Sequence, residues 1–150
     1  MNTMNKPVLD NYRFERKFII PERLTHSIEE VVKSNSALMR KIFCPRFINN
    51  IYFDNSRFKF FFENIDGVSE RMKTRIRWYG NLKGKIKKPV LEFKQKHGLT
   101  GSKTSIDLPS FDLKDIYRPG FLPSLFQNSN LDMRKKELIL SLTPSLINRY

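Results

Sequence analysis

The sequence predicts an α+β protein in which short antiparallel strands form a closed or curved sheet whose charged faces line an interior. Several short segments alternate charged and apolar side chains, which is typical of strands between a wet cavity and an apolar layer. Segments with helical spacing lie among them and can pack outside the sheet. The 150 residues are a one-domain length, and 39% hydrophobic content with 13 Phe indicates a folded globule.

The net charge predicts an anionic partner. Lys and Arg total 28 against 15 Asp and Glu, which gives +13. Such an excess suits nucleic acid, an anionic membrane surface or phosphate-rich small molecules, and charge alone does not choose among them. The single cysteine, Cys44, excludes an intrachain disulfide and fits a reducing compartment. Without an apolar run of about 20 residues or a signal-type N-terminus, we expect a cytoplasmic protein with no transmembrane segment.

The first predicted strand covers residues 12–20, after a disordered lead at 1–11, and begins the domain at 12–150. Glu15 and Lys17 share one face of this strand. A carboxylate and an ammonium there can help to hold a divalent cation and to meet phosphate. The spacing alone favours the alternative, an ordinary salt bridge on a solvated face.

The clearest helical pattern covers residues 21–41. Pro21 suits the first turn, and apolar residues recur at helical spacing from Leu24 to Val32. Asn35 offers an earlier end. The further elements expected are a strand at 46–54, an aromatic segment at 58–62 that fits either a short strand or a helical turn, a strand at 70–79, a lysine-rich loop at 80–89, strands at 90–96 and 102–108, an irregular stretch at 109–123, a helix at 130–142 and a final strand at 145–150.

The most informative strand carries a row of cations. Arg71, Lys73, Arg75 and Arg77 fall on one face, about 7 Å apart from one to the next. Such a row repels itself unless water or an anion screens it. The alternative is the solvated face of an edge strand. The Arg-rich row and the unbalanced net charge favour an anion site, because Arg presents a planar fork to phosphate oxygens.

The strand at 90–96 repeats this pattern, with Glu92, Lys94 and Lys96 on one face. The aromatic residues of these strands lie opposite the cations, as Trp78 and Phe93 do. A surface that binds single-stranded nucleic acid would need rings and cations on the same face. The pattern therefore favours phosphate without bases, and no nucleic-acid partner is expected.

Four motifs in this order resemble the VTC domain, the polyphosphate polymerase domain of the vacuolar transporter chaperone family. This family belongs to the triphosphate tunnel metalloenzyme, or CYTH-like, superfamily. The resemblance covers roughly residues 12–150. The motifs are Tyr12-Arg-Phe-Glu-Arg-Lys17, Asn50-Ile-Tyr-Phe-Asp-Asn55, Arg75-Ile-Arg-Trp-Tyr-Gly80 and Leu91-Glu-Phe-Lys94.

The resemblance implies an antiparallel β-tunnel that binds ATP or another nucleoside triphosphate by its phosphates. It implies Mn²⁺ or Mg²⁺ and transfer of the γ-phosphoryl group to a growing polyphosphate chain. The residues that match catalytic lumen positions are Lys17, Arg75, Arg77 and Lys94. Further phosphate contacts are expected from Arg71, Lys73, Lys96 and, in a segment similar to the family's later arginine-bearing strand, Arg149. Glu15 and Glu92 match acidic positions, where they would bind metal or pair with the lumen cations.

Two departures from the family pattern shape the expectation. Arg13 stands where the superfamily signature Glu-x-Glu-x-Lys has its first Glu, which fits a polymerase better than a triphosphatase. Family domains are longer, so we expect the tunnel to be incomplete in this chain, with association with a missing half or self-association left open. The alternatives are an inactive module that binds polyphosphate or inositol phosphate, and a triphosphatase of the same fold.

Overall fold

The computed structural model describes residues 13–14, 19–37, 39–40 and 42–150. The chain divides into two compact units. The smaller unit covers residues 15–46, and the larger unit covers the rest of the chain and contains the sheet.

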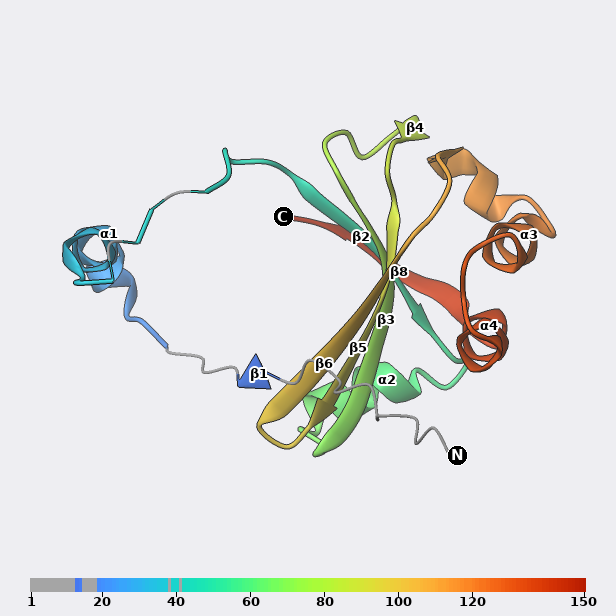
Figure 1. The fold of residues 1–150 in the computed structure, drawn as a ribbon. Helices are drawn as coiled ribbons and strands as arrows, with labels where there is room; N and C mark the ends of the chain where they lie inside the picture. Colours follow the sequence, from blue (N-terminus) through green and yellow to red (C-terminus); the bar gives the residue numbers. More distant parts are fainter. Residues whose placement is uncertain (1–12, 15–18, 38, 41) are drawn as a thin grey trace, which may run out of the picture. The chain divides into compact units, whose positions relative to one another are not determined.

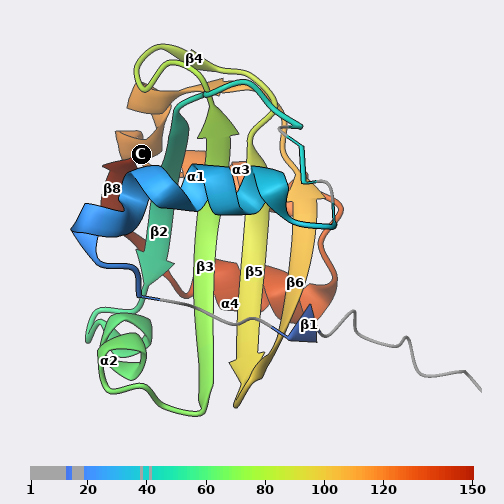
Figure 2. The same cartoon turned by 90° about the vertical axis from the view of Figure 1, so that its left-hand side faces the viewer.

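The larger unit is built on a six-stranded antiparallel sheet with the order β1-β6-β5-β3-β2-β8 (Figure 1). Figure 2 shows β2, β3, β5 and β6 side by side. A small second sheet pairs β4 with β7. The strands are β1 (Arg13–Phe14), β2 (Ile48–Asp54), β3 (Glu70–Tyr79), β4 (Lys85–Ile86), β5 (Val90–His97), β6 (Thr100–Asp107), β7 (Phe111–Asp112) and β8 (Thr143–Arg149). The predicted antiparallel α+β architecture is confirmed. Among the described residues the large sheet is open between β1 and β8, so the closed tunnel stays a prediction.

Most predicted strands are confirmed, with shifted ends. β3 covers the predicted strand at 70–79, and β2, β5, β6 and β8 lie within two residues of their predicted bounds. The strand predicted at 12–20 is described only as β1, because residues 15–18 lie outside the described residues. Ile19 and Ile20 are described but belong to no strand, so that prediction is wrong at its end.

The smaller unit contains the 3-10 helix η1 (Glu22–Leu24) and the helix α1 (Thr25–Ser34). The predicted helix at 21–41 is therefore too long. Asn35 is extended, with ψ 138°, and its side-chain oxygen accepts a hydrogen bond from the backbone N–H of Ala37 at 2.9 Å. This local turn competes with the next helical hydrogen bond, so the helix ends at Ser34.

In the larger unit, the aromatic segment forms the helix α2 (Lys59–Ile65), which decides between the two predicted conformations. The stretch expected to be irregular contains β7, the 3-10 helix η2 (Leu113–Tyr117) and the start of α3 (Phe121–Gln127). η2 begins with a capping box: Asp112 Oδ1 accepts from the backbone N–H of Lys114 at 3.2 Å, and Asp115 Oδ2 accepts from the backbone N–H of Asp112 at 3.3 Å. The helix α4 (Met133–Leu140) lies within its predicted range.

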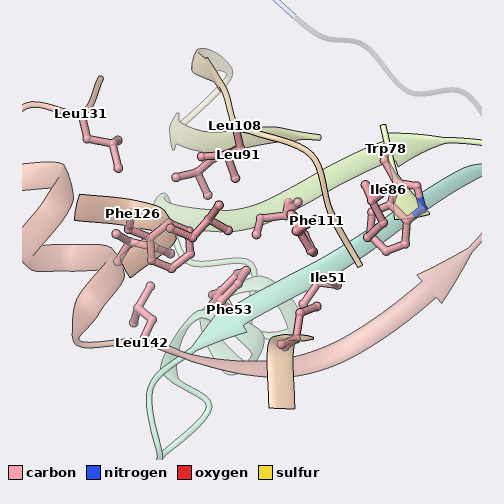
Figure 3. Packing of buried hydrophobic residues seen from close by; sticks show 14 of the residues in the cluster. Ile51, Phe53, Trp78, Ile86, Leu91, Leu108, Phe111, Phe126, Leu131 and Leu142 are labelled. Atoms are coloured by element: carbon pink, nitrogen blue, oxygen red, sulfur yellow. The ribbon is translucent and has the colours of Figure 1, made fainter. Parts of the chain in front are cut away.

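The hydrophobic core lies between one face of the sheet and the helices α3 and α4, which cover the same side (Figure 1). Ile51, Ile76 and Leu91 are opposite one another on the three strands β2, β3 and β5 and are fully buried. Phe53 meets Phe126 of α3 edge to face, with 5.8 Å between ring centroids (Figure 3). This is the apolar side of the predicted alternation, and its burial supplies the main stabilisation of the sheet.

None of the described helices has both the length and the apolar character needed to cross a membrane.

Replacing Leu91 by Ala tests this core. The side chain has 0% exposure, so its loss leaves a cavity in the centre of the sheet and is expected to lower the free energy of unfolding by about 2–5 kcal/mol. Leu99→Ala is the matched control, because Leu99 is 75% exposed in the β5–β6 turn. Urea titration measures both. Equal losses in the two variants would contradict the packing described here.

Candidate functional site

The sheet face opposite α3 and α4 carries the cations, and we call it the basic face. In antiparallel strands, directly opposite residues share a face. β3 and β5 pair Lys73 with Lys94 and Arg75 with Glu92, and β5 and β6 pair Lys94 with Lys103. On the described strands β3, β5 and β6 the basic face contains Arg71, Lys73, Arg75, Arg77, Lys94, Lys96 and Lys103, together with the carboxylates Glu92 and Asp107. The predicted row of cations is therefore brought together with a second row.

Glu92 lies at the centre of this face and is only 3% exposed. Its Oε2 accepts a hydrogen bond from Arg75 Nε at 2.8 Å and lies 2.8 Å from Arg75 Nη2. Its Oε1 lies 3.4 Å from both Arg77 Nη1 and Lys103 Nζ. A buried carboxylate is costly unless it is paired, and here three cations surround one anion. The contact cluster therefore keeps a positive charge.

Arg75 is buried between Glu92 and Tyr52. Its Nη1 donates to the Tyr52 hydroxyl at 3.2 Å. Burial by itself lowers the pKa of Arg75, but the hydrogen bonds to Glu92 and Tyr52 and their attraction raise it more, so the net pKa is raised. This guanidinium is charged at every accessible pH and is already engaged within the sheet face.

Arg77 retains hydrogen-bonding capacity. Its Nε is buried and has no hydrogen-bond partner among the described residues. Asn50 lies opposite it in the register, and the Asn50 Oδ1 also has no described partner, although its amide nitrogen donates to Asn148 Oδ1 at 3.0 Å. Buried polar atoms of this kind are normally satisfied by water or a bound ion. Arg77 Nε is thus a donor left for a ligand, whereas Arg75 Nη2, which also has no hydrogen-bond partner among the described residues, faces Glu92 Oε2 at 2.8 Å.

Two predicted arginines differ from Arg77 in their surroundings. Arg71, near the start of β3, donates from Nη1 to the Val68 carbonyl at 2.6 Å. Arg149 pairs in the register with Asn49, which is opposite Trp78 and therefore on the side of the core. Its guanidinium lies over the Phe47 ring, 3.5 Å from the centroid. The structure does not bring Arg149 to the basic face.

The predicted pair Glu15 and Lys17 lies outside the described residues. Two residues that contact the cluster, Lys103 and Tyr52, were not among the predicted site residues. Lys103 stands on β6, whose alternation is weak in the sequence, and only the pairing of β6 with β5 places it beside Glu92. Tyr52 stands within one of the four motifs, and its alternation with Ile51 and Phe53 is the signal that could have placed it on the basic face.

The described carboxylates do not fit a divalent cation. Such ions need several oxygen ligands, and the described residues contain no group of three or more His, Cys, Asp or Glu that could hold one. Both oxygens of Glu92 face cations instead. Of the two roles expected for Glu92, the observed contacts match pairing with the basic residues.

Glu92→Gln is expected to destabilise the protein strongly, because it leaves Arg75, Arg77 and Lys103 to repel one another without their shared anion. Removing one partner of a buried ion pair typically costs about 3–5 kcal/mol. Added sulfate or tripolyphosphate should recover part of this loss by replacing the missing charge.

Glu70→Gln is the control for this variant, because the Glu70 side chain is 78% exposed at the start of β3. Its loss should change stability by less than about 0.5 kcal/mol. Chemical denaturation with and without the anions measures both effects. A Glu92→Gln protein as stable as the control, and insensitive to anions, would show that the cluster is not organised around Glu92.

Comparison with known proteins identifies the family. Neither the curated proteins nor the solved structures provide a match to this chain. The family model of the VTC domain matches residues 12–146, which include the whole described basic face. The chain therefore belongs to the VTC-domain family, which indicates a polyphosphate-related function in general.

Proposed function

We propose that the basic face binds the phosphates of a nucleoside triphosphate and of polyphosphate, and that the domain transfers the γ-phosphoryl group to the polyphosphate chain within a tunnel. The observation that carries this proposal is the excess of cations on one sheet face around a single shared carboxylate, Glu92. Membership of the VTC-domain family supports the choice of polyphosphate over other polyanions.

The residues divide into two roles under this proposal. Arg75 is a positioning residue, because its guanidinium holds Glu92 and the Tyr52 hydroxyl. Arg77, with its unpartnered Nε, and the lysines of the neighbouring strands would contact phosphate oxygens. The lysines in question are Lys73, Lys94, Lys96 and Lys103. A chain of phosphates carries repeated negative charge, so it suits cations repeated along and across strands.

In the proposed reaction, a terminal oxygen of polyphosphate attacks the γ-phosphorus of the nucleoside triphosphate. The bond from that phosphorus to the β–γ bridging oxygen breaks, and the nucleoside diphosphate leaves with the electron pair. The polyphosphate chain is then one phosphate longer. Catalysis of this kind depends mainly on positioning and on neutralising charge, which the cations of the basic face would supply. Because Glu92 does not fit a divalent ion, we assign no step to the Mn²⁺ or Mg²⁺ that the family implies.

A second candidate is a module that binds polyphosphate without turnover. The observation that favours it is again Glu92, the buried carboxylate of the basic face, which pairs with cations. The two candidates share the anion site and differ only in whether a phosphoryl group is transferred there.

Incubation with ATP and Mn²⁺ or Mg²⁺ separates these functions. The polymerase proposal predicts polyphosphate that lengthens with time, detected on gels and removed by a polyphosphatase. Release of inorganic phosphate without polymer would identify a triphosphatase. Tight binding of polyphosphate without either product would identify the binding module, and the absence of binding would contradict both candidates.

Arg77→Gln and Lys94→Gln are each expected to weaken the binding of tripolyphosphate by about tenfold, because each removes a charge-assisted hydrogen bond. Both variants should also reduce the dependence of affinity on salt concentration. Lys114→Gln is the matched control, since this exposed lysine belongs to η2, away from the strands of the basic face. Calorimetric titration at several salt concentrations measures the affinities. Three variants that behave alike would mean that net charge, rather than the basic face, binds the anion.

A further inference from the structure

A cavity of about 540 Å³ lies next to the basic face, where α2 meets β2, β3 and β8. Its volume is in the range of small-molecule sites. Tyr52 and Lys73 of the basic face form part of its wall, and Phe58, Phe61 and Phe62 bring aromatic rings from α2 and the residue before it. Figure 2 shows α2 beside one end of β2.

The three phenylalanines are exposed, although large apolar side chains are usually buried. Phe58, Phe61 and Phe62 are 48%, 53% and 53% exposed, and the rings of Phe61 and Phe62 meet edge to face with 5.4 Å between centroids. Single exposed apolar residues are ordinary, but a cluster of rings that lines a hollow is typical of a binding surface. These rings are not among the residues that pack against the hydrophobic core, whereas the ring of their neighbour Phe60 is.

The wall of the cavity is held in place by hydrogen bonds to the end of β2. Asp54 is 4% exposed, its Oδ1 accepts from the backbone N–H of Phe60 at 3.0 Å, and its Oδ2 accepts from that of Phe61 at 2.9 Å. These bonds satisfy the free N–H groups of the first turn and fix α2 to the sheet. The backbone that carries the rings is therefore fixed before any ligand arrives, which reduces the entropy cost of binding.

Two side chains of the cavity wall link it to the charged cluster. Lys73 lines the cavity and is the neighbour of Arg75 in the row on β3. Tyr52 lines it as well, and the Tyr52 hydroxyl accepts the hydrogen bond from Arg75. A molecule with a flat aromatic group at one end and several phosphates at the other matches this order of aromatic rings and cations.

We propose that this cavity binds the nucleoside part of the nucleoside triphosphate, with the base against the phenylalanine rings and the phosphates along the basic face. This inference rests on the proposed function, since the phosphates occupy the site proposed there. It adds a means of selecting the donor, because inorganic polyphosphate has no base to fill the cavity. The same chain could then distinguish the nucleotide from the polymer although both carry the same phosphate groups.

The test compares ATP with inorganic tripolyphosphate by calorimetric titration in EDTA, so that no turnover interferes. The wild-type protein is expected to bind ATP on the order of tenfold more tightly than tripolyphosphate, which corresponds to one stacked base. Phe61→Ala should abolish this preference and leave the affinity for tripolyphosphate unchanged. Phe61→Trp should preserve it. Phe47→Ala is the matched control, because Phe47 has a similar exposure of 57% and lies next to the other end of β2.

The outcomes separate the two proposals. Equal affinities for ATP and tripolyphosphate in the wild type, or a preference that survives Phe61→Ala, would overturn the nucleoside site while the phosphate site stands. Binding of ATP that depends on Phe61, without any binding of tripolyphosphate, would uphold the cavity and overturn the proposed role of the basic face. Loss of the preference for ATP in Phe61→Ala, but not in Phe61→Trp or Phe47→Ala, supports both the nucleoside site and the phosphate site.

Discussion

The carboxylate of Glu92 and the three cations around it organise the charged side of this protein. Glu92 on β5 contacts Arg75 and Arg77 on β3 and Lys103 on β6, so one anion links three strands on the same face. Without it, the cations would stand side by side in a partly buried setting, where like charges repel strongly. With it, the cluster keeps a positive charge that is fixed in place. An external anion can then bind without first ordering the side chains.

The alternation of the strands makes this charge compatible with a stable core. Ile76 lies between Arg75 and Arg77 in the sequence, yet it points to the opposite side and is fully buried with Ile51 and Leu91. The helices α3 and α4 cover that side, and the basic face is the opposite side of the sheet. Alternate side chains of a strand point to opposite faces of the sheet, so the apolar core and the cations lie on different faces. A strand with four cations can therefore be a central strand.

Alternation within single strands was enough to predict β3 and the sharing of one face by Arg71 to Arg77. Contacts between strands were harder to predict, because they depend on register. Lys103 reaches Glu92 only through the pairing of β5 with β6, and Arg149 falls on the core side because it pairs with Asn49. The helix α2 was ambiguous in the sequence, because its start depends on Asp54, whose hydrogen bonds belong to the folded structure. The family resemblance predicted the general function that the VTC match supports.

The central claim is that the basic face, rather than the net charge of the chain, binds polyphosphate. The loop between β3 and β5, which includes β4, offers a direct comparison, because it carries four exposed lysines outside the six-stranded sheet: Lys83, Lys85, Lys87 and Lys88. Titration of isotope-labelled protein with tripolyphosphate, followed by NMR, reports on every lysine and arginine separately. The account predicts the largest shifts at Lys73, Arg77, Lys94 and Lys103, and small shifts in the loop. The largest shifts in the loop, with none at Arg77, would contradict it.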